Sequence, residues 1–248
     1  MFDYKNAGLY SSAFRAYRDN LILILICGTL FVVLEYVNVR FDNKTSYWMP
    51  IIVQIWFAYY VHRTILNGKA DNLTDLSSTE KTFTSFLWRS LLLFLFLMLL
   101  IIPMTIFALI FKDFLGDETE TFVSGMILLG FPLCGIFLSI LGTTLPAAVD
   151  GADKSFRAAY QRSRGQILST FWKYVYGPTL FTIQIIAASF GLQGLGTPTD
   201  VFSADNSFDP LGAVVSLILE YIGLFGTTLG VTILCKAYLH ATPQTDIT

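Results

Sequence analysis

Six long apolar runs restrict the possible folds of this chain more than any other feature. A membrane-spanning helix needs about 20 mainly apolar residues, because each residue adds about 1.5 Å and the hydrocarbon layer is about 30 Å thick. The runs cover residues 21–37, 47–65, 90–111, 122–149, 167–191 and 211–239. We therefore predict an all-α, polytopic integral membrane protein, in which residues 1–248 form one domain with six transmembrane helices.

The composition agrees with a membrane location and excludes several soluble classes. Only 14% of the residues are charged, against roughly 25% in an ordinary soluble domain. So few charges cannot cover the outside of a soluble enzyme of this length. The formal net charge of −2 provides no basic field for nucleic acid. We expect membrane lipids, and not nucleic acid, as partners.

Lysine and arginine are distributed unevenly between the two sides of the predicted membrane. Eleven of them lie before the first run, in the second-to-third connection or in the fourth-to-fifth connection. The connections on the other side hold only Arg40, Lys44 and Lys112, together with several acidic residues. Because positively charged short loops stay in the cytoplasm, both termini should be cytoplasmic. Bulky residues follow the first run where a signal peptide would have a cleavage site, so we expect this run to be retained.

A short amphipathic segment with aromatic residues and an arginine precedes each odd-numbered run. The segments cover residues 12–18, 82–89 and 155–162. Their last arginines, Arg18, Arg89 and Arg162, are separated by 71 and 73 residues, which is one helical hairpin each. We predict an internal repeat of three hairpins with interfacial elbow helices, whose rings lie at headgroup depth and whose cations face phosphate.

These elbow helices serve either as simple anchors or as recognition sites for an anionic lipid or a partner protein. The middle one follows a capping box over residues 77–80, a pattern typical of a helix N-terminus. The residues expected at lipid headgroups or at the interface are Arg18, Arg89, Arg157, Arg162, Arg164 and Lys173.

The fourth-to-fifth connection carries the sequence LPAAVDGADKSFRAAYQRSRG over residues 145–165. This stretch resembles the cytoplasmic elbow of bacterial six-span proteins of the YciC-like family, and the membrane domain of certain glycerophosphodiester phosphodiesterases is similar. The second-to-third connection, with Arg63 and Asn67-Gly68-Lys69, looks like the matching elbow of the preceding hairpin. The resemblance implies a polytopic protein of the bacterial cytoplasmic (inner) membrane. It implies no catalytic residues, because the phosphodiesterase chemistry lies in a separate soluble barrel.

Polar side chains inside the apolar runs are candidates for transport or for buried polar roles, because a charge there costs about 2.5 to 3.5 kcal/mol on insertion scales. Glu220, near the middle of the sixth run, is either a protonatable transport residue or a neutral acid hydrogen-bonded within the bundle. Glu35 lies nearer the outer interface, where an ion pair with Arg40 is favoured. Gln54 and Gln184 are expected to link helices by hydrogen bonds. A cavity shared by Glu220, Gln54 and Gln184 would favour transport.

Small residues and prolines within the runs predict packing and bending. Gly226 and Gly230 form a small-xxx-small pair in the sixth run, and such pairs let helices approach closely. Pro103, Pro132 and Pro178 are expected to kink their helices and to free backbone carbonyls that neighbouring groups must satisfy.

The sequence contains no pattern that indicates catalysis. Its three cysteines and two histidines are scattered, which excludes the clustered spacing of a disulfide framework or a zinc site. No phosphate-binding loop, metalloprotease or hydrolase motif is present. We expect no enzyme activity, no metal and no cofactor. The favoured function is a non-catalytic accessory or assembly subunit that binds another membrane protein or lipid; the alternative is a small transporter or lipid-handling permease that uses a buried glutamate.

Overall fold

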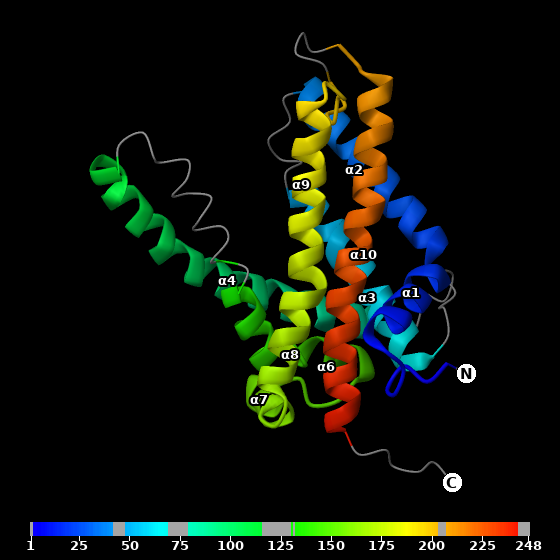
Figure 1. Cartoon of the computed structure of the whole chain (residues 1–248). Coiled ribbons are helices and arrows are strands. Elements are labelled where there is room, and N and C mark those ends of the chain that lie inside the picture. Colours follow the sequence, from blue (N-terminus) through cyan, green and yellow to red (C-terminus); the bar gives the residue numbers. More distant parts are fainter. Residues whose placement is uncertain are drawn as a thin grey trace. The chain divides into compact units, whose positions relative to one another are not determined.

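The structure is a computed structural model that describes residues 2–41, 48–68, 79–115, 130, 132–202 and 207–242. The elements named in this part of the chain are all helices (Figure 1), so the all-α prediction is confirmed. The chain divides into two compact units. Unit 1 comprises Met1–Asp75 and Tyr176–Ile233, and unit 2 comprises Leu76–Val175 and Leu234–Thr248.

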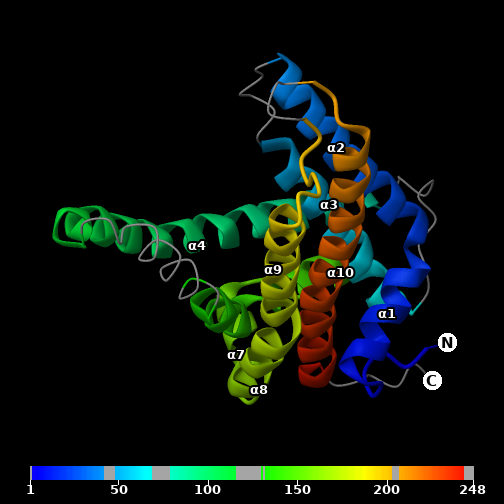
Figure 2. The same ribbon diagram turned by 45° about the horizontal axis from the view of Figure 1, so that its top comes forward.

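Unit 1 contains the first three helices, all of the next-to-last helix and most of the last one. In chain order they are α1 (Leu9–Asp19), α2 (Leu21–Phe41), α3 (Met49–Asn67), α9 (Leu180–Gly194) and α10 (Pro210–Ala241). Figures 1 and 2 both show α9 running beside α10. The contact is close, because a Cβ atom added to Gly226 on α10 would lie 3.2 Å from Cδ1 of Phe181 on α9. The predicted close approach at Gly226 is therefore confirmed.

A hydrogen-bonded pair fixes the break between α1 and α2 in unit 1. The buried Asn20 side chain donates to the carbonyl of Ala16 at 2.8 Å and to Oγ1 of Thr64 on α3 at 3.0 Å. Thr64 donates back to the amide oxygen of Asn20 at 3.1 Å. Because buried polar groups need partners, these hydrogen bonds explain why a polar residue is tolerated at the buried position 20. It also attaches the predicted first elbow helix to α3.

Unit 2 contains a long helix and a set of short ones. They are α4 (Thr79–Leu115), the helix Pro132–Leu141, α6 (Thr144–Asp150), α7 (Phe156–Ser163), α8 (Ile167–Tyr174) and the end of α10. Gly151 ends α6 with a φ of 74°, a conformation that favours glycine. The Ser155 hydroxyl then accepts a hydrogen bond from the Ala158 N–H and caps α7.

A π-helical turn, η3 (Val175–Thr179), joins α8 to α9 and contains Pro178. The Tyr10 hydroxyl of α1 donates to the Tyr176 carbonyl in this turn at 2.8 Å. Proline cannot donate a helical hydrogen bond, so a local disturbance of the helix is expected there. The π-helical turn at Pro178 agrees with the predicted disturbance of this helix.

Four helices are long and apolar enough to cross a membrane: Leu21–Phe41, Lys81–Leu99, Ile167–Gly194 and Pro210–Ala241. A fifth results if the pair Pro132–Leu141 and Thr144–Asp150, bent by 41°, is counted as one span. These segments overlap five of the six predicted runs. The remaining run, 47–65, forms α3, a helix of 19 residues with lower hydropathy. Residues 122–129 of the predicted fourth span lie outside the described residues.

The predicted elbow segments differ from one another in the structure. The first forms α1 and the third forms α7, each a separate amphipathic helix. The middle segment belongs to α4, which Figure 2 shows as one continuous helix, so it is not a separate elbow helix and α4 begins at Thr79, before the predicted run 90–111. The helix formers after Thr79 continue directly into the apolar run with no break. Residues 77 and 78 of the predicted capping box lie outside the described residues.

Candidate functional site

The elbow of unit 2 begins at the turn between α6 and α7. Asp153 accepts a hydrogen bond from the Ser155 N–H at 2.9 Å. Hydrogen bonds from the Ser155 backbone and side chain, with a smaller contribution from the arginines Arg162 and Arg89, hold the pKa of Asp153 below its usual range. The carboxylate therefore stays charged and stabilises the turn from which Lys154 projects.

Arg162 of α7 points into unit 2. Its guanidinium lies 5.4 Å from the centre of the Tyr238 ring on α10, and its Nη1 donates to the Asp153 carbonyl at 2.8 Å. Its Nε and Nη2 atoms are buried and have no hydrogen-bond partner among the described residues. Burial lowers the pKa of this guanidinium. The structure thus places Arg162 in packing contacts, whereas the sequence analysis expected it at the headgroups.

The outer surface of the same elbow carries the other expected cations. Arg157 and Arg164 are exposed, and neither makes an ion pair with a described residue. Tyr160 on α7 and Leu168 and Trp172 on α8 are 48%, 69% and 46% exposed. Lys173 of α8 is half-buried. An exposed surface that combines cations with aromatic and aliphatic side chains is typical of a helix lying at the membrane interface.

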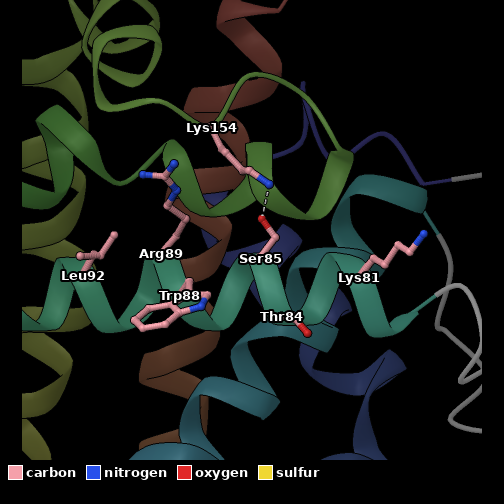
Figure 3. A pocket seen from close by; sticks show the side chains of 7 residues that line it. All are labelled: Lys81, Thr84, Ser85, Trp88, Arg89, Leu92 and Lys154. Carbon is pink, nitrogen blue, oxygen red and sulfur yellow. Dashed lines mark hydrogen bonds between the residues drawn. The ribbon is translucent and has the colours of Figure 1, made fainter.

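Arg89 lies inside unit 2 at the edge of a pocket with a volume of about 740 Å³. Six lining residues come from α4 and the seventh is Lys154 (Figure 3): Lys81, Thr84, Ser85, Trp88, Arg89 and Leu92 form the α4 side. The Lys154 Nζ donates a short hydrogen bond to the Ser85 hydroxyl. Figure 3 shows Lys81, Ser85 and Arg89 projecting from α4 toward the side from which Lys154 comes.

The aromatic ring of Phe156 holds the Arg89 side chain at the pocket edge. The Arg89 guanidinium lies 5.4 Å from the centre of this ring, a distance typical of a cation–π contact. Phe156 in turn contacts Phe96 edge to face, with the ring centres 5.7 Å apart. The first residue of α7 therefore positions an arginine of α4.

Arg18, the counterpart of Arg89 in the predicted repeat, belongs to unit 1. It is exposed on α1, and its Nε lies 3.7 Å from Asp19. Asp19 also accepts a hydrogen bond from the Arg15 Nε at 2.9 Å. The Arg18 side chain is thus exposed, and its place at the lipid headgroups stays a prediction.

The polar residues of the apolar helices only partly come together in unit 1. The Ser216 hydroxyl of α10 donates to Glu35 of α2 at 3.3 Å. Glu220 lies one helical turn after Ser216, close enough to Glu35 for electrostatic repulsion. The structure therefore gives Glu35 a serine partner, and the expected ion pair with Arg40 is not among its described contacts.

The two glutamines do not join this pair of acids. The exposed Gln54 of α3 donates to Oγ1 of Thr227 on α10 at 3.1 Å, so the prediction of an interhelical hydrogen bond is confirmed for Gln54. The Gln184 side chain is exposed on α9 and has no hydrogen bond to a described residue. No described contact brings Glu220, Gln54 and Gln184 together.

Sequence reasoning missed the pocket beside α4. Lys81, Ser85 and Arg89 follow at intervals of four residues, which places them on one helix face, so their spacing could have indicated the site. Lys154 and its bond to Ser85 depend on tertiary contacts that no local pattern reveals. Among the described residues, no group of three or more His, Cys, Asp or Glu side chains could hold a metal ion.

Comparison with known proteins adds no further assignment. No protein-family model, curated protein or solved structure matches this chain. Its apolar helices nevertheless suggest a membrane protein.

Proposed function

We propose that the chain is a non-catalytic, polytopic protein of a bacterial cytoplasmic membrane that binds lipid through its cytoplasmic elbows. In this role it acts as an accessory or assembly subunit of another membrane protein. The observation that supports lipid binding is the outer surface of α7 and α8, on which Arg157 and Arg164 lie beside exposed aromatic and aliphatic side chains. Cations there can reach phosphate while the rings enter the headgroup layer.

The proposed topology has six spans in three hairpins, with both termini in the cytoplasm. The four apolar helices and the bent pair provide five of these spans. Helix α3 is the remaining one, because its 19 residues reach about 28 Å at 1.5 Å per residue. The basic residues of the elbows support the orientation. A cysteine introduced at Arg164 and labelled only from the cytoplasmic side would test it.

Charge reversal at the exposed elbow arginines tests lipid binding. We expect the variant carrying Arg157→Glu and Arg164→Glu to retain at least tenfold less phosphatidylglycerol after gentle purification, since each basic residue near an anionic surface contributes about 1 kcal/mol. Arg40→Glu, at the exposed end of α2, is the control and should retain the wild-type amount. Unchanged lipid retention in the double variant would remove the proposal.

Native mass spectrometry of the gently purified protein tests the accessory role. A second membrane protein bound at fixed stoichiometry would support an assembly function, and its dissociation constant could then be measured. A monomer that carries lipid alone, from cells in which all membrane proteins are present at native levels, would contradict this part of the proposal.

The juxtaposition of Glu35 and Glu220 favours a second candidate, a small transporter or lipid-handling permease. Ionisable groups inside membrane helices are often parts of ion or substrate routes, and here Glu220 lies close enough to Glu35, the partner of Ser216, for electrostatic repulsion. In proteoliposomes, Glu220→Gln should abolish the proton flux that a pH difference drives, while the protein remains folded and inserted. Equal proton flux in wild type and variant would reject this candidate.

A further inference from the structure

We propose that the pocket beside α4 binds the phosphate group of an anionic membrane lipid, with Lys81, Arg89 and Lys154 as its cationic ligands. This inference rests on the proposed lipid-binding function and names a specific site and ligand class within it. The outer surface of α7 and α8 can attract any anionic lipid, whereas the pocket can hold one molecule in a defined position.

The charge of the pocket is the first argument. Three cations line it, and none forms an ion pair with a described residue. Asp153, the acid of the turn that carries Lys154, is exposed and already accepts a hydrogen bond from the Ser155 N–H. One carboxylate in the adjacent turn cannot neutralise three cations, so the pocket keeps a net positive charge that an anion can offset.

The placement of the donors is the second argument. Lys81, Ser85 and Arg89 lie one turn apart on the same face of α4 and project to one side (Figure 3). Lys154 reaches the middle of this row from the opposite wall and donates to Ser85. Phosphate oxygens accept hydrogen bonds from ammonium, guanidinium and hydroxyl groups together. A phosphate between Lys154 and Arg89 would therefore meet all three kinds of donor.

The Arg89 side chain is already oriented for this role. Its guanidinium lies 5.4 Å from the centre of the Phe156 ring, and a ring that contacts the cation does not use up its N–H donors. No described residue accepts a hydrogen bond from these groups. Ordering a free arginine costs side-chain entropy, and the contact with Phe156 supplies part of this ordering before a ligand binds.

The apolar residues next to the cations indicate a lipid as the source of the phosphate. Leu92 lines the pocket one turn beyond Arg89, and Trp88 beside it is 64% exposed. The α4 residues that line the pocket belong to the apolar stretch Lys81–Leu99, where Leu91 and Leu95 are exposed. A phosphate bound here would have an apolar path for acyl chains on one side and the headgroup layer on the other.

Titration of the full-length, delipidated protein in a neutral detergent tests the site. Native mass spectrometry would count bound phosphatidylglycerol, with zwitterionic phosphatidylcholine as the comparison lipid. We expect one saturable phosphatidylglycerol molecule, held about fivefold less tightly in Lys154→Ala and at least twentyfold less tightly in Lys81→Ala with Lys154→Ala, because each cation contributes about 1 kcal/mol. Lys154→Arg should restore binding, and Arg40→Ala should leave it unchanged.

Each outcome either supports or overturns the inference. Wild-type phosphatidylglycerol binding in the folded Lys81 and Lys154 double variant would overturn it. Inorganic phosphate that binds alone, with the same dependence on Lys154, would support the phosphate site and reject the lipid as its source. If Arg157→Glu with Arg164→Glu lowers total lipid retention while the lysine variants do not affect the saturable molecule, the proposed function stands and the pocket assignment fails.

Discussion

Replacement of Arg162 by alanine should destabilise unit 2, although this residue belongs to a surface elbow. Three observations set the magnitude: the cation–π contact with Tyr238, the 2.8 Å hydrogen bond to the Asp153 carbonyl, and the two buried guanidinium nitrogens without a described partner. A partly desolvated cation–π pair contributes about 1 to 2 kcal/mol, and a hydrogen bond from a charged donor contributes about 1.5 to 3 kcal/mol.

The unpartnered nitrogens offset part of this gain. An unsatisfied buried polar group costs about 1 to 3 kcal/mol, and the guanidinium is only partly buried, so solvent reduces both the gain and the cost. We therefore expect Arg162→Ala to lower the free energy of unfolding by about 1 to 3 kcal/mol. Arg157→Ala on the same helix is the matched control, and it should change the stability by less than about 0.5 kcal/mol because Arg157 is exposed.

The assay is denaturant-induced unfolding in detergent micelles, followed by circular dichroism and by tryptophan fluorescence. A double-mutant cycle with Tyr238→Leu separates the ring contact from other effects of the substitutions. Equal stability of the Arg162 and Arg157 variants, or a coupling energy of zero with Tyr238, would refute the packing role of Arg162. With either result, Arg162 would again be a candidate for binding lipid headgroups.

Two further predictions concern close packing and pH. Gly28→Ala should destabilise unit 1 by about 1 to 3 kcal/mol, because a Cβ atom there would overlap the Tyr221 ring. Gly223→Ala, with nothing within 4 Å of the added atom, should be neutral or stabilising. Thermal unfolding compares the two variants directly, and similar losses of stability would contradict the overlap. The pKa of Asp153 is lowered in the folded protein, so its contribution to stability is complete above the ordinary aspartate pKa of about 3.9 and disappears as the pH falls through the lower folded value. Asp153→Asn should therefore lose less stability than wild type when the pH falls below about 4, as measured by urea unfolding across pH, and parallel pH profiles would show that Asp153 makes no such contribution.

The features that local pattern determines were predictable from the sequence. The length of the apolar runs predicted long helices, and these are present at Leu21–Phe41 and Pro210–Ala241. The amphipathic spacing of aromatic residues and arginines predicted the separate helices α1 and α7. Such patterns can be recognised in a sequence because the residues on one face of a helix recur at a fixed spacing. The bend of 41° between Pro132–Leu141 and Thr144–Asp150 was not predicted from the run of apolar residues.

The roles of the polar side chains depended on contacts between residues far apart in the chain. Arg157 and Arg162 looked equivalent in the sequence, yet the Arg162 guanidinium contacts the Tyr238 ring whereas Arg157 is exposed. Glu35 has a partner in Ser216 on the last helix, while Arg40, only five residues away on its own helix, is not a described partner.

The roles of the cations in unit 2 also depend on contacts between residues far apart in the chain. Lys154 was counted only for its charge, and its position opposite Ser85 converts a row of three side chains on α4 into one wall of a pocket. A positive charge near a membrane attracts anionic lipid wherever it lies, but a defined binding position requires donors on at least two elements whose distance the fold maintains. In unit 2, α4 and the turn that follows α6 provide such donors, and the variants at Lys81 and Lys154 remove them without altering the exposed arginines of α7.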